Sequence, residues 1–103
     1  MNLFGGDVTR ALGTIRSAFP DLEIDAEMQR LPGHRSTKVL CVVVRGWAES
    51  GRDALSADEA SALAPRVWQV AKSSWDLPFV LSSVIDTDGK EWLVNEMGNL
   101  ETF

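Results

Sequence analysis

Few residues of this chain have side chains suited to nucleophilic catalysis. There is one histidine, His34, and one cysteine, Cys41. A serine or cysteine nucleophile needs a neighbouring base, and His34 is the obvious candidate for that base. However, His34 follows Pro32 and Gly33 in an evident turn, and Cys41 lies in a valine-rich apolar run that favours a buried, unreactive thiol. We therefore predict that neither residue is catalytic.

Acidic side chains are the other candidates for a chemical site. Residues 86–90, with the sequence DTDGK, start like a calcium-binding loop, but the further ligand before the glycine and the closing glutamate are missing. The Asp-Gly pair is typical of a tight hairpin turn instead. Glu23, Asp25 and Glu27 recur at every second position and could hold a cation or act as an acid and base pair. Such a row is more often a solvated face or a contact to basic groups on a neighbour.

A nucleotide-binding loop is not indicated either. Gly5 and Gly6 follow no strand and lack the lysine and the serine or threonine of a phosphate-binding loop. We therefore predict no catalytic residue, no metal and no cofactor. A small enzyme is accordingly the weakest of the functions considered.

The elements that position these residues begin with a helix. Apolar residues recur at steps of three and four, which predicts a short amphipathic helix over residues 4–18. Asp7 is the expected N-cap. Pro20 is expected to end the helix because it disfavours helical geometry at Phe19.

Short strands are expected in the rest of the chain. Alternation of apolar and mostly acidic residues over 22–28 predicts a strand with one buried and one acidic face. The next strand, 38–47, contains an apolar run from Val39 to Val44, so both of its faces must be covered. Further strands are predicted at 67–71, 79–85, 91–96 and 100–103. The predicted core is Val42, Val44, Trp68, Val84, Trp92 and Val94, with Leu12 and Ile15 from the helix.

A segment rich in small and charged residues separates two of these strands. Residues 48–64 contain no aromatic side chain, and we interpret them as an insertion. Long loops in compact domains are usually functional or ordered only by a partner. Ser56 and Glu59 match a capping box, so a short helical turn is expected at 57–63, before Pro65.

Length and charge limit the architecture and the partners. A chain of 103 residues fits a single domain, with a helical segment at 1–20 and β-structure at 22–103. The expected fold class is mostly β (α+β): a small β-barrel or rolled antiparallel sheet with one N-terminal helix and a long loop. A net charge of −5 argues against binding nucleic-acid phosphates or anionic membranes, and the apolar runs are too short to cross a bilayer. A single cysteine suits a reducing cytosol.

The second half of the chain contains a series of short motifs in a definite order. It consists of VRG at 44–46, a polar excursion, VWQVA at 67–71, DLP at 76–78 and the hairpin sequence at 84–94. This order resembles the head-to-tail joining proteins of tailed bacteriophages, also called stopper, head-completion or tail-attachment proteins. The opening NLF at 2–4 and the TIR helix at 14–16 look similar to the lambda-type members.

The resemblance implies a structural protein of the virion. Members of that family form a small β-barrel with an N-terminal helix, and they assemble as a ring, a hexamer or a dodecamer, between the portal or adaptor and the tail proteins. The family implies assembly in the host cytoplasm, DNA that only passes through the channel, no membrane contact and no catalytic residue. Loop 48–64 would face the channel or a neighbouring ring, and an acidic barrel would repel the passing phosphates.

Interface residues are predicted in and around the insertion. Trp47 and Trp75 are the expected anchors, because partly exposed tryptophans are common in interfaces. In an isolated subunit 48–64 should be mobile, and neighbouring subunits would pair its charges and cover its leucines. The predicted interface set is Trp47, Glu49, Arg52, Asp53, Leu55, Asp58, Glu59, Leu63, Arg66, Trp75 and Phe103.

A different class of function fits the charge nearly as well. An acidic inhibitor, such as an immunity or anti-defence protein, would cover a basic nuclease or nucleic-acid-binding surface. The row of Glu23, Asp25 and Glu27 and the negative net charge support this alternative. Neighbouring genes would separate the two hypotheses: portal and tail genes favour the joiner, and a toxin or nuclease gene favours the inhibitor.

Overall fold

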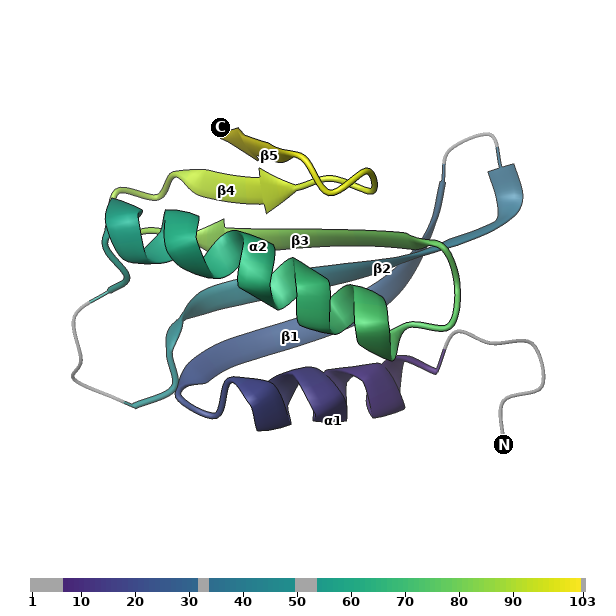
Figure 1. Ribbon diagram of the computed structural model, residues 1–103, viewed down its shortest axis with the longest axis horizontal. Helices are drawn as coiled ribbons and strands as arrows, with labels where there is room; N and C mark the ends of the chain where they lie inside the picture. The colour runs from purple at the N-terminus through teal and green to yellow at the C-terminus, as the bar shows by residue number, and fades with distance from the viewer. Residues whose placement is uncertain (1–6, 32–33, 50–53, 103) are drawn as a thin grey trace.

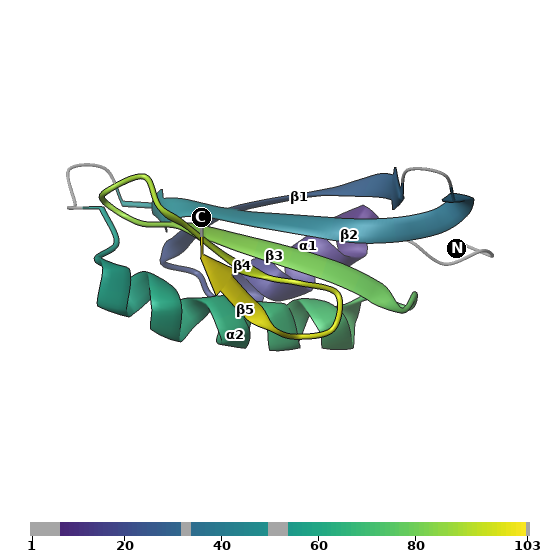
Figure 2. The same ribbon diagram turned by 90° about the horizontal axis from the view of Figure 1, so that it is seen from above.

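The computed structural model describes residues 7–31, 34–49 and 54–102 (Figure 1). Their elements are α1 (Val8–Ala18), β1 (Leu22–Leu31), β2 (His34–Trp47), α2 (Ala57–Ser74), β3 (Phe79–Ile85), β4 (Glu91–Val94) and β5 (Leu100–Thr102). The described elements form two layers, a single sheet and a pair of helices. Figure 2 shows both helices on the same side of the sheet.

The five strands form an open, mixed sheet. Their order is β1-β2-β3-β4-β5, and every neighbouring pair is antiparallel except the central pair β2–β3, which is parallel. A parallel pair needs a crossover connection, and α2 supplies it. The fold is therefore a small α+β fold with two helices. The predicted barrel is not formed, because β1 and β5 lie at opposite edges and helices, not a rolled sheet, cover the core.

Helix α1 forms where the apolar periodicity predicts it and begins at Val8. The Asp7 side chain accepts a hydrogen bond from the Arg10 backbone amide at 3.1 Å, which confirms the predicted N-cap. Positions 4–6 of the predicted helix lie outside the described residues. Ile15 and Leu12 both pack against the core as predicted, Ile15 fully buried and Leu12 partly buried.

Helix α2 contains the helical turn expected at 57–63 but continues through residues 67–71, so the strand predicted there is wrong, and residues 57–64 belong to a long helix and not to a loop. The capping box is confirmed: Ser56 Oγ accepts from the Glu59 amide at 3.1 Å, and Glu59 Oε1 accepts from the Ser56 amide at 3.0 Å. The helix continues through Pro65 although proline lacks the amide that would complete one helical hydrogen bond. The helix is stabilised by a stripe of its own side chains that is buried against the sheet. This stripe consists of Ala60, Ala64, Val67 and Ala71.

The β3–β4 hairpin contains the predicted Asp-Gly turn. Gly89 has a φ of 78°, a conformation that glycine adopts without strain. Asp86 Oδ1 accepts hydrogen bonds from the amides of Asp88 at 2.9 Å and Lys90 at 3.0 Å, and Asp86 Oδ2 accepts one from Trp92 Nε1 at 2.9 Å. The calcium-like sequence is thus a turn. Within the described ranges no cluster of side chains is suited to hold a metal ion.

The core lies between the helices and one face of the sheet. Four of the predicted strand residues are buried there, namely Val42, Val44, Val84 and Val94. Trp68 and Trp92 pack against the core as predicted, but they are partly buried and less enclosed than the four valines. Neither α1 nor α2 is long and apolar enough to cross a membrane.

Candidate protein-interaction surface

The two faces of the sheet differ in what covers them. Along β2, Leu40, Val42 and Val44 are buried in the core beneath the helices. Cys41 and Val43 point to the opposite face, because side chains alternate along a strand, and neither packs against that core. Strand β2 therefore has apolar side chains on both faces, as the sequence predicts. The described elements cover only one of them (Figure 2).

An apolar strip follows the central strands on the open face. The strand register aligns Cys41 with Leu81, and Val43 with Ser83, so the alternate residues of β2 and β3 share this face. None of the apolar side chains involved belongs to the core beneath the helices or packs against it. The members of the apolar strip are Cys41, Val43, Phe79, Leu81, Ile85 and Leu93, whereas Val39, on the same face, is buried at 3% exposure.

Acidic side chains border the apolar strip on both sides. Glu23, Asp25 and Glu27 lie on β1 at one edge of the sheet. Glu91 of β4 and Glu101 of β5 lie towards the other edge, on the same face as Leu93 by strand alternation. We call these five residues the acidic borders. One row of cross-strand partners contains the whole pattern: Asp25, Val43, Ser83, Leu93 and Glu101.

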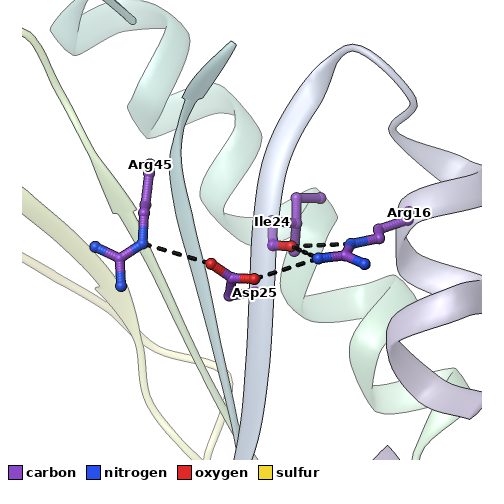
Figure 3. Close-up of polar contacts among 4 residues, drawn as sticks. All are labelled: Arg16, Ile24, Asp25 and Arg45. Carbon is purple, nitrogen blue, oxygen red and sulfur yellow. Dashed lines mark hydrogen bonds and ion pairs between the residues drawn. The ribbon is translucent and has the colours of Figure 1, made fainter. Parts of the chain in front are cut away.

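Asp25 lies between two arginines from different elements (Figure 3). Its Oδ1 is 3.2 Å from Arg16 Nη2 of α1, and its Oδ2 is 3.6 Å from Arg45 Nε of β2. All three side chains are more than half exposed, so each ion pair contributes at most about 1 kcal/mol. The charge of Asp25 is thus compensated within the chain. The border residues without an ion pair among the described residues are Glu23, Glu27, Glu91 and Glu101.

A shallow hollow of about 150 Å³ lies on the open face between β1 and β2. Asp25, Glu27, Cys41, Val43 and Arg45 contribute to its lining. Burial, and to a lesser extent the charge of Glu27, raises the pKa of the Cys41 thiol above its ordinary value. The thiol is therefore protonated at neutral pH. The predicted burial of this thiol is only partly confirmed, because it is half-buried on the open face and outside the core cluster.

Among the residues whose burial the structure describes, Asp86 is the most enclosed ionisable side chain, at 5% exposure. The hydrogen bond from the Trp92 indole is the main cause that lowers the pKa of Asp86. Burial opposes this shift, whereas the amides of Lys90 and Asp88 and the charge of Lys90 lower the pKa further. The carboxylate stays ionised and organises the turn, which is a structural role.

The predicted interface residues do not form one surface. Leu55 and Trp75 are buried in the core, at 0% and 5% exposure, so they are not free anchors. The Leu55 carbonyl also accepts a hydrogen bond from the Thr87 amide at 2.7 Å, which fixes the segment that leads into α2. Trp47 and Leu63 are half-buried and line a separate hollow of about 170 Å³.

The charged members of the predicted set are scattered. Asp58 and Glu59 are exposed in the first turn of α2, and the Arg66 guanidinium carbon lies 5.8 Å from the centre of the Phe19 ring. All three lie on α2, on the opposite side of the sheet from the apolar strip. Glu49 is exposed after β2. The predicted interface residues outside the described part of the chain are Arg52, Asp53 and Phe103.

Only part of the open face could be predicted from the sequence. The alternation at 22–28 predicts the acidic row on β1, and the run from Val39 to Val44 predicts two apolar faces of β2, but no surface was predicted at Leu81, Ile85 and Leu93. The available signal was the spacing of Phe79, Leu81 and Ile85 at alternate positions of one strand. His34, predicted in a turn, is the first residue of β2.

Comparison with known proteins adds no relative. No protein-family model, curated protein or solved structure matches this chain. The function is therefore argued from the open face itself.

Proposed function

We propose that this protein is a binding module that attaches to a basic protein surface through the open face of its sheet. The observation that carries the proposal is the apolar strip enclosed by the acidic borders. Contiguous apolar surface with a polar rim is characteristic of protein–protein interfaces. The proposal is a specific form of the acidic-inhibitor alternative.

The apolar strip would supply the binding free energy. Removal of apolar surface from water contributes about 25 cal/mol per Å², and the strip offers several partly exposed aliphatic side chains and the partly exposed ring of Phe79. Parallel strands that are apolar on both faces normally lie in sheets with both faces covered. The central pair β2–β3 is of this kind, yet only α1 and α2 cover it. A partner bound to the open face would cover the second face of the sheet.

Charge determines the kind of partner. The chain has a net charge of −5, and four of the five border residues have no ion pair among the described residues. Lysine and arginine side chains of a partner would neutralise these carboxylates, whereas an acidic surface would be repelled. A second copy of this chain would bring acidic borders against acidic borders. The charge pattern therefore favours a different, basic protein.

The head-to-tail joiner is still a prediction, and it draws less support. A ring needs contacts between identical copies, and the barrel that the resemblance implies is not formed. Sedimentation velocity separates the two hypotheses. The binding module should sediment as a monomer at micromolar concentration, whereas a joiner should reach a ring-sized species.

The test of the proposed function uses Cys41 as the attachment point of a photo-crosslinker. Cys41 is the only cysteine of the chain and lies on the open face, so the label reports on that face alone. The matched control carries the label on α2, in the double variant Cys41→Ser/Gln69→Cys. A partner that crosslinks in cells from Cys41 and not from position 69 would then be purified for binding measurements.

Binding of that purified partner decides the question. Leu81→Glu, within the apolar strip, should weaken binding at least about tenfold, and Gln69→Glu, which adds the same charge on α2, should leave it unchanged. Thermal unfolding of both variants checks that they fold. Equal binding by the two variants, or a partner whose contact surface is acidic, would refute the proposed function.

A further inference from the structure

We infer that the occupant of the open face is one amphipathic helix of the partner, apolar along one side and basic on both flanks, that lies along β2 and β3. This inference rests on the proposed function and specifies the shape of the partner. It follows from the dimensions of the apolar strip, from the connection between its strands and from the placement of the acidic borders.

The width of the open face matches one helix. The row from Asp25 to Glu101 crosses all five strands, which corresponds to about 19 Å at the usual spacing between strands. A helix with its side chains is about 10–12 Å across. One helix on the apolar strip therefore leaves room for a lysine or arginine on each flank to extend to an acidic border.

The length of the strip also fits a helix. Phe79 and Ile85, at the two ends of β3, both belong to the apolar strip. Six residue steps of a strand span about 20 Å. A helix with a rise of 1.5 Å per residue covers that distance with about 13 residues, between three and four turns. Such a helix would present apolar residues at steps of three and four to the strip.

The topology favours a helical layer over an added strand. Strands β2 and β3 with the crossover α2 form a βαβ unit, the unit from which parallel sheets with helices on both faces are built, and β2–β3 is the one parallel pair of this mixed sheet. Strand addition would occur at an edge of the sheet, away from the apolar strip on its face. At the β1 edge, the Arg16 guanidinium already donates hydrogen bonds to the carbonyl oxygen of Ile24. The occupant that uses the observed apolar surface is therefore a helix.

The two flanks contribute unequally. On the β1 side, Asp25 is paired with Arg16 and Arg45, so Glu23 and Glu27 are the carboxylates that attract a basic side chain. On the other side the attracting carboxylates are those of Glu91 and Glu101. The partner helix should thus carry basic residues on both sides of its apolar stripe.

The test uses synthetic peptides of about 13 residues as probes of the intact protein. The first contains leucine and lysine with helical spacing of the leucines. The second has the same composition with leucine at every second position, the spacing of a strand. The third keeps the helical spacing and replaces every lysine with glutamate. The rate of Cys41 alkylation by iodoacetamide measures occupancy of the open face, because this thiol lies in the strip.

The helical leucine–lysine peptide should slow alkylation of Cys41 at least about tenfold, and the other two should not. Glu27→Lys and Glu91→Lys should each weaken this protection at least about fivefold, because each reverses a charge in one acidic border. The matched control Glu96→Lys, in the β4–β5 turn, should leave it unchanged.

The outcomes separate this inference from the proposed function. Equal or better protection by the strand-spaced peptide would overturn the helix and leave a basic occupant of the face in place. Protection by the glutamate peptide, or failure of every peptide to protect Cys41, would overturn the helix and count against the proposed function as well. Protection that persists in Glu27→Lys and Glu91→Lys would overturn the assignment of the basic flanks.

Discussion

The carbonyl oxygen of Ile24 accepts two hydrogen bonds from the guanidinium of Arg16, one from Nε at 3.0 Å and one from Nη2 at 2.9 Å (Figure 3). Ile24 lies on β1, which is an edge strand of the sheet. A free strand edge presents backbone groups on which another chain can pair. Arg16 of α1 donates hydrogen bonds to one of these backbone carbonyls, so another strand cannot pair with it, and this protects the edge.

Replacement of Arg16 by alanine should therefore promote self-association of the protein. Arg45→Ala is the matched control, because it removes an ion pair with the same Asp25 but leaves the Ile24 carbonyl covered. Sedimentation velocity over a range of concentrations should show dimers of Arg16→Ala where the wild type and Arg45→Ala are monomeric. If both variants behave alike, the edge-protecting role of Arg16 is wrong.

Leu55 should contribute to stability as a core residue. Its side chain is fully buried, so Leu55→Ala should lower the free energy of unfolding by about 2–5 kcal/mol, because a cavity replaces packed atoms. Leu100→Ala, at a position that is 43% exposed on β5, is the control and should change it by no more than about 0.5 kcal/mol. Urea unfolding measures both. A loss at Leu55 as small as that at Leu100 would restore the interpretation of this segment as a loose loop.

Asp86 should make stability depend on pH in the acidic range. Its pKa in the folded protein is below the ordinary value of 3.8, so the ionised carboxylate stabilises the fold above that value, and the stabilisation is lost as the pH falls through the folded pKa. The Tm difference between the wild type and Asp86→Asn should be largest at neutral pH and should shrink in acid.

A change at Trp92 tests the cause of the lowered pKa of Asp86. Trp92→Phe removes the hydrogen bond that lowers the pKa of Asp86 most, so the acid transition of this variant should move to higher pH. A Tm difference for Asp86→Asn that is the same at neutral pH and in acid would contradict the role assigned to the carboxylate.

The Ser82→Ala variant of the protein should be more stable than the wild type. The hydroxyl of Ser82 is fully buried on the helix-covered face, beside Val42 and Val94 in the neighbouring strands, and has no hydrogen-bond partner among the described residues. Removal of an unpaired buried hydroxyl should raise the free energy of unfolding by about 1 kcal/mol. Ser83→Ala, on the opposite face of the same strand, is the comparison. A destabilised Ser82→Ala would show that the hydroxyl is satisfied in solution.

Signals confined to a few neighbouring residues were sufficient for much of the fold. The Asp7 cap, the alternation from Leu22 to Met28 and the Asp-Gly turn at Gly89 each depend on contacts within a few positions, and the structure contains all three. The acidic row of the open face belongs to this class too. Its position beside an apolar strip could not be predicted, because that depends on which strands are neighbours.

Helix α2 shows where local signals compete. Pro65 and the β-branched residues near Val67 indicate a break and a strand, whereas the spacing of Ala60, Ala64, Val67 and Ala71 indicates one helical face. The helical face prevails because tertiary burial of that stripe outweighs the hydrogen bond that proline removes. Without this helix the crossover between β2 and β3 is absent, so the error also produced the predicted barrel.

The parallel pairing of β2 and β3 also has a consequence for the order in which the chain folds. The β1–β2 pair and the β3–β4–β5 meander each join strands that are consecutive in sequence, so their loops close at little entropic cost. The parallel pairing joins positions 39–44 to positions 79–84, and the whole of α2 lies between them in the sequence. Contacts of such long sequence separation are slow to form. We therefore expect the centre of the sheet, and with it the open face, to form late in folding.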